Sequence, residues 1–303
     1  MRVTQGMLSN NMLGNLSKSY GEMGKYQEQL STGKKISKPS QDPVVAMKGM
    51  NYRSQVGQVE QFQRNIGEVH NWMDNSDSAL DEGTQAIQRI RELNVQASNG
   101  TYEDGERENI AKEVRQLKEH LGEIANTEVN GKHIFNGENT TEAPIDMENL
   151  KDFDLEDFDE ETLVDANDSP VELEVSPGVK MQVNVTPSSV FNDDLFRDIE
   201  KFASDLESGA SEDELGSSLS QFDEHVDSFV GERADLGARM NRVELIEDRL
   251  GTQEESAKRM MSDNEDAEIE KVITELKTQE SVHRAAMGVG ARVMQPSLMD
   301  FLK

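Results

Sequence analysis

The 303-residue chain contains no cysteine. The side chains that could support catalysis or hold a metal are therefore its histidines and its clustered acidic residues. Without thiols, thiolate catalysis, disulfide bonds and cysteine-ligated metals are excluded. The histidines are scattered, and none belongs to an HExxH sequence, which would place two imidazoles on one helical face. They are His70, His120, His133, His225 and His283. We assign no catalytic residue and no cofactor, and we expect a protein that is not an enzyme.

One acidic stretch, DFDLEDFDEETL at 152–163, begins like a calcium-binding loop, with acidic residues at its first, third and fifth positions. The sixth position of such a loop is glycine and the twelfth is glutamate. Here these positions hold Asp157 and Leu163. We interpret the stretch as a solvated acidic loop and assign no metal ligand, with divalent-ion binding as the weaker alternative.

Charge is distributed very unevenly along the chain. The formal net charge is −29, which argues against nucleic acid or an anionic membrane as a general partner, because both need clustered Lys and Arg. Residues 1–50 nevertheless carry seven Lys and Arg against three Asp and Glu, whereas 138–225 carry four against 26. If copies of the chain pack together, we expect the contacts at its ends. The alternative is that the acidity serves only solubility.

Low hydrophobicity indicates helical layers rather than a large spherical core: 34% of residues are hydrophobic and the mean hydropathy is −0.72. The N-terminus lacks the apolar run of a cleavable signal, and no stretch approaches an 18-residue apolar span. We expect a soluble chain, or one exported without a cleavable signal.

Apolar residues recur at seven-residue intervals over 43–98, which predicts one long helix. At 1.5 Å per residue it would be about 80 Å long. Helices are also predicted over 105–127 and from about 211 onward, where apolar positions keep a three-four spacing. The first series consists of Val45, Tyr52, Val59, Ile66, Met73, Leu80 and Ile87.

The two ends of the chain read as weaker helices. Residues 3–30 contain Gly6, Gly14, Gly21 and Gly24, each costing about 1 kcal/mol relative to Ala inside a helix. The run from 269 to 294 is interrupted by glycines, and Pro296 ends it. An antiparallel return of the chain would pair the two ends. The expected coiled-coil and assembly interface is Leu13, Leu16, Tyr20, Met23, Leu30, Val289, Val293, Met294, Leu298 and Phe301.

A basic loop, LSTGKKISKPSQDP at 30–43, separates the first two helices and is predicted to be an inter-domain linker. Gly33 can terminate the first helix, and Pro39 and Pro43 cannot continue it. Asp42 before Pro43 is typical of an N-cap followed by proline at the first helical position.

The middle of the chain changes character. Residues 171–175 and 181–185 alternate apolar and polar side chains around SPGVK, which predicts a β-hairpin. The predicted fold is mainly α: an elongated antiparallel long-helix, coiled-coil-like rod with a small inserted β-containing domain. The predicted domains are paired terminal helices (1–42 and 271–303), a long-helix domain (43–137 and 211–270) and an acidic outer domain (138–210).

Several motifs in order give the sequence a resemblance to the flagellin superfamily, covering roughly 1–137 and 211–303. QRIRELNVQASNGTY at 88–102 is similar to flagellins generally. The other motifs are RVTQGMLSNNMLGNLS near the start, LSTGKKISKPSQDP at 30–43, NGKHIFNG at 130–137, VNVTPSSVF at 183–191, GARMNRVELIEDRL at 237–250 and the closing MQPSLMDFLK.

This resemblance implies a non-enzymatic structural subunit of the bacterial flagellum, exported through the type III channel to the cell exterior. It implies terminal helices that pair as an inner assembly domain and are disordered before assembly. KPSQDP and RVTQGML favour the subunit type at the hook–filament junction over the bulk filament subunit, flagellin, which is the alternative. From another class, a free secreted coiled-coil adhesin or receptor ligand would need an exposed epitope. The implied partners are hook-associated protein 1, flagellin, further copies of this chain, and a type III export chaperone at the C-terminal helix.

Overall fold

The computed structural model describes residues 5–98, 104–153 and 163–293. The chain divides into two compact units, one of residues 1–59 and 252–303 and the other of residues 60–251. The two longest helices contribute to both units, and each unit is described by itself below. The three-part domain division made from the sequence stays a prediction.

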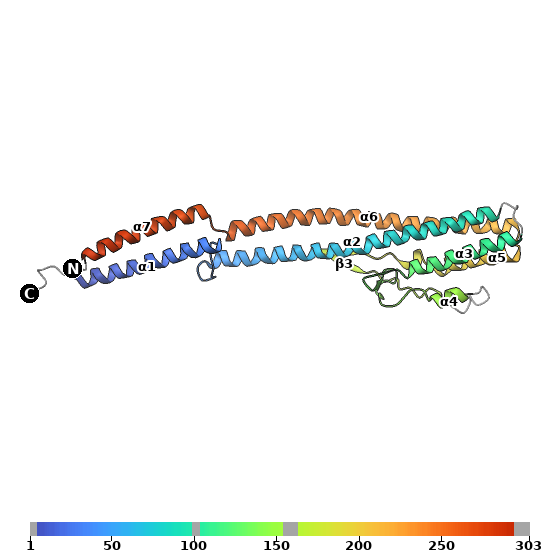
Figure 1. Ribbon diagram of the computed structural model, residues 1–303, viewed down its shortest axis with the longest axis horizontal. Coiled ribbons are helices and arrows are strands. Elements are labelled where there is room, and N and C mark those ends of the chain that lie inside the picture. Colours follow the sequence, from blue (N-terminus) through green and yellow to red (C-terminus); the bar gives the residue numbers. More distant parts are fainter. Residues whose placement is uncertain (1–4, 99–103, 154–162, 294–303) are drawn as a thin grey trace, which may run out of the picture. The chain divides into compact units, whose positions relative to one another are not determined.

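Helices account for most of the described chain (Figure 1). The strands of the described residues form two separate two-stranded antiparallel sheets. The predicted class, mainly α with long helices and a small β-containing insertion, is therefore confirmed. The helices are α1 (Gln5–Thr32), α2 (Pro43–Ala97), α3 (Asp104–Ala125), α4 (Met147–Asp152), α5 (Asp193–Ser208), α6 (Glu212–Glu265) and α7 (Ile269–Val293), and the strands are β1 (Glu128–Val129), β2 (Lys132–His133), β3 (Glu172–Ser176) and β4 (Val179–Gln182).

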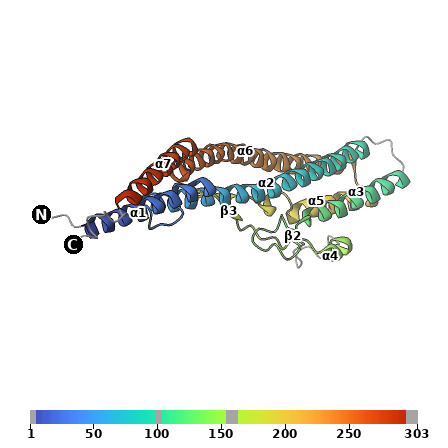
Figure 2. The ribbon, with the colours of Figure 1, turned by 60° about the vertical axis from the view of Figure 1, so that its left-hand side comes forward.

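The core of the second unit is built on the sevenfold series of α2 and α6, which lie side by side in Figures 1 and 2. On α2 the series is fully buried from Ile66 to Ile87. Burial of such a stripe supplies the main driving force, since the helices expose polar residues on their other faces. The corresponding buried series on α6 is Phe222, Phe229, Leu236, Val243 and Leu250.

Two residues on α2 depart from the simple apolar packing: a glycine that makes room for an aromatic ring, and a buried asparagine. A Cβ on Gly83 would lie 2.6 Å from Cε1 of Phe229, so only glycine lets this ring approach. Asn94 continues the sevenfold series and is fully buried. Its side-chain oxygen accepts a hydrogen bond from Ser98, whereas its Nδ2 has no hydrogen-bond partner within the described residues.

Charged side chains border the apolar seam. Arg233 on α6 pairs with Asp77 at 2.7 Å and also with Asp81, both on α2. Further along, Arg91 contacts Asp223 at 2.5 Å. Surface pairs of this kind contribute at most about 1 kcal/mol each, so they orient the helices more than they hold them.

Helices α3 and α5 pack together through a buried charge pair. Lys118 is 2% exposed, and its ammonium group lies 2.8 Å from Oε2 of Glu200. Arg115 contacts the other oxygen of Glu200 at 3.0 Å. Phe202 on α5 meets Phe222 on α6 edge-on, with ring centroids 5.6 Å apart. Thus α5, although it lies within 138–210, contributes to the core of the second unit.

The predicted hairpin is present as β3 and β4, paired in antiparallel register with Leu173 opposite Met181. Its turn places Gly178 at φ +72°, a backbone conformation that costs glycine little. The side chain of Asn65 on α2 donates to the carbonyl of Glu174 at 2.7 Å. This bond ties the hairpin to α2.

Leu236 offers a direct test of the buried stripe. Leu236→Ala should lower the free energy of unfolding by about 2–5 kcal/mol, because it leaves a cavity in a closed core. Leu245→Ala on the same helix, where Leu245 is 72% exposed, should change it by no more than about 0.5 kcal/mol. Urea unfolding followed by circular dichroism measures both, and equal midpoints would contradict the assigned core.

Candidate assembly surface and its joint

Helices α1 and α7 lie side by side in the first unit (Figures 1 and 2). The less exposed positions of α1 follow a four-three spacing and define a single seam. These positions are Met12, Leu16, Ser19, Met23, Tyr26 and Leu30. The facing positions on α7 are Val272, Leu276, Gln279, His283, Ala286 and Gly290.

This seam is thin and partly polar. The amide of Gln279 donates to the hydroxyl of Ser19 at 3.3 Å. A Cβ on Gly290 would lie 3.0 Å from Cε of Met12, so the two helices are close at this point. Within the described part of the seam only Ser19, Val272 and Gly290 are buried. A pair with so little buried apolar area gains little from packing, and its helices are weak formers of their own.

The structure brings only part of the predicted ladder into this seam. Leu16, Met23 and Leu30 lie in it. Leu13 is 53% exposed, and Tyr20 is 71% exposed and lies at the edge of the seam, with its ring centroid 6.3 Å from that of His283. The expected alternation placed them in the stripe, whereas the stripe runs through Met12, Ser19 and Tyr26 instead. Small and polar residues are acceptable where two helices come close, which a reading of apolar spacing alone does not detect.

The predicted residues of the C-terminal helix are less fully described. Val289 is 56% exposed and thus does not lie in the seam. Val293 is the last residue of α7, and its side chain is not described. Met294, Leu298 and Phe301 lie outside the described residues. Their assignment to an assembly interface stays a prediction.

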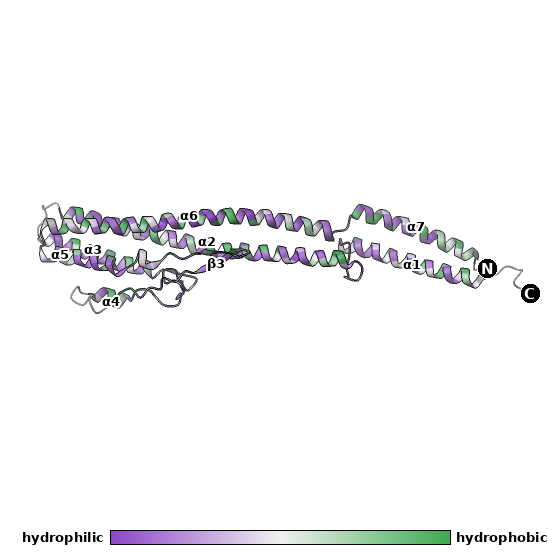
Figure 3. Cartoon of the chain, turned by 180° about the vertical axis from the view of Figure 1, so that it is seen from behind, coloured by the Kyte–Doolittle hydropathy of each residue, from purple (hydrophilic) through white to green (hydrophobic). Residues whose placement is uncertain are grey.

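Apolar side chains remain exposed on both helices. Figure 3 shows the hydrophobic residues of α1 and α7 in green along the ribbon. An exposed apolar surface of this kind marks a site of protein association. Its members, each at least 40% exposed, are Met7, Leu8, Leu13 and Tyr20 on α1 and Ile269, Ile273, Val282, Met287 and Val289 on α7. We call this set the outer apolar surface.

The predicted linker begins and ends as expected. Gly33 has φ +68°, and its N–H donates to the carbonyl of Gln29 at 2.9 Å, closing α1. At the other end, the carboxylate of Asp42 accepts from the N–H groups of Val44 and Val45 at 3.0 and 3.1 Å. Pro43 is the first residue of α2. The helix-boundary roles of Gly33, Asp42 and Pro43 are confirmed, while exposed Pro39 lies within the loop.

The linker is bound to the C-terminal end of α6 by ion pairs and hydrogen bonds, which the sequence did not predict. Glu265 is 6% exposed, and its Oε2 lies 2.7 Å from Arg53 and 3.5 Å from Lys34. Lys34 also pairs with Asp266 at 2.7 Å. A Cβ on Gly49 would lie 2.5 Å from Oε1 of Glu265, so glycine makes room for this carboxylate.

Two backbone hydrogen bonds complete this arrangement. The N–H of Lys35 donates to the carbonyl of Glu265 at 2.6 Å, and the N–H of Ala267 donates to the carbonyl of Gly33 at 2.8 Å. We call these residues together with Lys34, Arg53 and Asp266 the clasp. The basic KK pair and the acidic NEDAE stretch were its signals in the sequence, but their 230-residue separation concealed the pairing.

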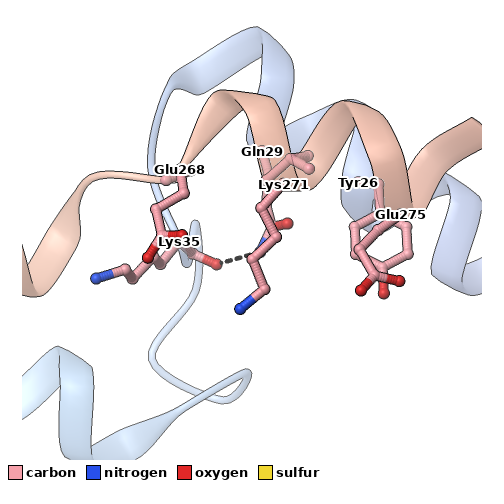
Figure 4. Close-up of a pocket in the computed structure, with 8 residues that line it drawn as sticks. Tyr26, Gln29, Lys35, Glu268, Lys271 and Glu275 are labelled. Carbon is pink, nitrogen blue, oxygen red and sulfur yellow. Dashed lines mark hydrogen bonds between the residues drawn. The ribbon is translucent and has the colours of Figure 1, made fainter.

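Beside the clasp lies a hollow of about 270 Å³ between α1 and the start of α7 (Figure 4). The amide of Gln29 donates to the carbonyl of Lys35 at 2.6 Å across its floor. Tyr26 and Glu275 line one side. Burial, and then the nearby charges of Glu275 and Glu22, raise the pKa of Tyr26. The phenol is therefore neutral at physiological pH and can only exchange hydrogen bonds.

Nothing described in this chain points to a metal centre or a membrane span. Among the described residues there is no group of three or more His, Asp or Glu side chains placed to hold a metal ion. Most of the calcium-loop-like stretch, 154–162, lies outside them. None of the described helices is both long and apolar enough to cross a membrane.

The clasp predicts a pH dependence. The pKa of Asp266 is lowered, first by the hydrogen bond from Lys34 and then by that from Ser262. A lowered pKa means that the stabilisation is present above the ordinary aspartate pKa of about 4 and is lost as the pH falls through the folded value. We expect the amide protons of Lys35 and Ala267 to lose exchange protection on acidification, as measured by NMR.

The matched variant for this experiment is Asp266→Asn. It keeps the size of the side chain but removes its charge, so protection should already be reduced at neutral pH and should change little on acidification. An unaltered pH profile in this variant would contradict the role assigned to Asp266.

Comparison with known proteins relates the first half of the chain to one family. Residues 3–140 match the bacterial flagellin N-terminal helical region. Flagellar hook-associated protein 3 of Escherichia coli (strain K12) is 36% identical over 149 residues, which is 49% of this chain and 47% of that protein. The protein of the same name from Salmonella typhimurium is 35% identical over 48% of this chain and 47% of its own. The chain thus spans about half the length of these two relatives.

Similarity over the whole length is lower. Flagellin of Bacillus subtilis (strain 168) is 26% identical over 302 residues, covering 97% of each chain. The solved structure of a flagellar hook-associated protein from Vibrio parahaemolyticus has a TM-score of 0.67 at 18% identity and covers 75% of this chain and 100% of its own. Hook-associated protein-3 of Legionella pneumophila has a TM-score of 0.62 at 14% identity, covering 71% and 98%. These structures share the fold, and residues 3–140 are similar in sequence to the bacterial flagellin N-terminal helical region.

Proposed function

We propose that this chain is a structural subunit at the junction between the flagellar hook and the flagellar filament. The observation that carries the proposal is the outer apolar surface, which the paired helices α1 and α7 leave without a partner in the described chain. A subunit that must be covered by others of its kind or by related subunits needs such a surface, whereas an enzyme would need a built polar site. The two relatives named hook-associated protein 3 support the junction position.

The residues proposed for assembly divide into two groups. Leu16, Met23 and Leu30 hold α1 against α7. Leu13, Tyr20 and Val289 are each more than half exposed and are proposed to contact neighbouring subunits. Val293, Met294, Leu298 and Phe301 are proposed to extend this contact.

The partners follow from the position. We propose that further copies of this chain, hook-associated protein 1 and flagellin cover the outer apolar surface in the assembled flagellum, outside the cell. Before assembly, a type III export chaperone is proposed to cover the apolar side of α7, in the manner of an amphipathic helix laid in a groove. Covering one surface in both states would prevent premature polymerisation.

A second candidate function is that of flagellin itself, the bulk filament subunit. The observation in its favour is the match to Bacillus subtilis flagellin along 97% of both chains. The two functions differ in copy number: a junction subunit forms a short zone at the filament base, whereas flagellin forms the filament.

Deletion of the gene separates these candidates. For a junction subunit, electron microscopy should show hooks without filaments, and flagellin should accumulate in the medium because it has nothing to attach to. Antibody against the chain should label wild-type flagella only at the filament base. Labelling along the filament would identify flagellin, and intact filaments in the deletion strain would contradict both functions.

The outer apolar surface can be tested by placing charge on it. Leu13→Asp with Tyr20→Asp should leave the helical circular dichroism unchanged but prevent filament attachment, because two carboxylates would be buried without partners at a cost of several kcal/mol. Asn11→Asp with Asn15→Asp adds the same charge at exposed polar positions of α1 and should support normal filaments. Normal filaments from both double variants would remove Leu13 and Tyr20 from the interface.

A further inference from the structure

The first unit carries two exposed patches of opposite charge beside the clasp, and the second of them shares Ile269 and Ile273 with the outer apolar surface. The first, which we call the basic patch, lies on the linker and the opening turns of α2. Its apolar members Val44, Met47 and Met50 are 57%, 56% and 62% exposed. Lys38 and Lys48 are exposed beside them, and neither ammonium group is in an ion pair within the described residues.

The local backbone holds this patch in place. The Asp42 cap fixes the first turn of α2, and Val44, Met47 and Lys48 share one helical face because they are three or four residues apart. Met50 lines a hollow of about 130 Å³ together with Ile36 and Pro39 of the linker. The patch is therefore a preformed surface with a shallow apolar recess and cationic margins.

The second patch, which we call the acidic patch, lies on the opening turns of α7. Ile269 and Ile273 are 43% and 40% exposed. Glu268 and Glu270 are exposed beside them and take part in no ion pair within the described part of the chain. An open hollow of about 450 Å³ is lined by these two glutamates, Ile269 and the exposed Lys271, so the patch carries two negative charges against one positive.

The charges of the clasp are paired with one another and not with the charges of the two patches. Lys34 and Arg53 are already paired with Glu265 and Asp266. Lys38 and Lys48 of the basic patch take no part in these pairs, and neither do Glu268 and Glu270 of the acidic patch or the exposed Lys271 beside them. One chain thus presents a basic patch and a complementary acidic patch on the same unit.

We propose that the basic patch of one copy docks on the acidic patch of a neighbouring copy. The contact is heterologous, since two different patches meet, and repetition of such a contact generates a closed ring or a helical row. Burial of the apolar side chains supplies the free energy. The charges select orientation and partner, because exposed ion pairs contribute little affinity by themselves.

A second copy is the occupant that the charge distribution favours. The chain is strongly acidic in total, at −29, yet it concentrates basic residues in its first 50 positions. Like-charged bodies repel unless basic and acidic surfaces are brought together. The inference rests on the proposed function only in that copies lie beside one another in the assembly.

Cysteine pairing tests the contact directly, because the chain has no cysteine of its own. The full-length variants Met47→Cys and Ile269→Cys are purified, mixed in equal amounts at increasing concentration and oxidised. The mixture should give several-fold more disulfide-linked dimer than either variant alone. Met47→Cys mixed with Leu245→Cys, which has a more exposed thiol in the second unit, sets the yield of random collisions. A mixture yield no higher than this control would overturn the proposal.

Charge reversal then tests complementarity. Adding Lys38→Glu and Lys48→Glu to the Met47→Cys copy should reduce the dimer yield to the collision level. Adding Glu268→Lys and Glu270→Lys to the Ile269→Cys copy at the same time should restore it, since the contact is again between opposite charges. Loss without restoration would show that the charges act within one molecule and would overturn the contact.

The outcome is separable from that of the proposed function. Hooks without filaments in the deletion strain, together with a failed cysteine test, would keep the junction position and remove this contact. Successful pairing with labelling along the whole filament would keep the contact and assign it to the bulk filament subunit.

Discussion

Burial of one apolar stripe on each of two long helices is the interaction on which the second unit depends. With only 34% hydrophobic residues, the chain cannot fill a broad core, so each helix concentrates its apolar residues in a single line. The hairpin of β3 and β4 is tied to α2 by the bond from Asn65 to Glu174. Helix α5, which packs on α3, joins the same core through Phe202 against Phe222. Without the buried apolar residues of α2 and α6, these smaller elements would have no packed helix pair to attach to.

The first unit depends on a different balance. Its helix pair buries little, and the clasp therefore contributes a larger share of its order than ion pairs contribute in a well-packed unit. Glu265 is the central residue, because it is buried, receives two cations and leaves no room for a side chain at position 49. The outer apolar surface is the counterpart of this weak seam: apolar area not used inside the molecule is available to other molecules.

Much of this organisation could be read from the sequence, and the successes and failures have physical reasons. The start of α2 was predicted at about residue 43, because Asp42 with Pro43 is a strong local signal, and the predicted apolar run from Ile269 coincides with the start of α7. The β1–β2 hairpin was missed although Asn130 and Gly131, both at positive φ, form a typical turn pair, because its strands have only two residues each. Local patterns also could not reveal that Tyr20 lies at the exposed edge of the seam, since that depends on how closely α7 approaches at Ser19 and Gly290.

Gly83 has a consequence for how the long helices find one another. A strict sevenfold repeat is ambiguous in phase: one helix could slide past the other by a whole heptad and still match apolar against apolar. The ring of Phe229 removes this ambiguity, because it fits over a residue without a side chain. A slide of seven residues along α2 would bring the ring to Ser76 or to Ile90, where a Cβ occupies the space. The lack of a side chain at Gly83 thus distinguishes the native alignment of the two helices from alignments shifted by one heptad.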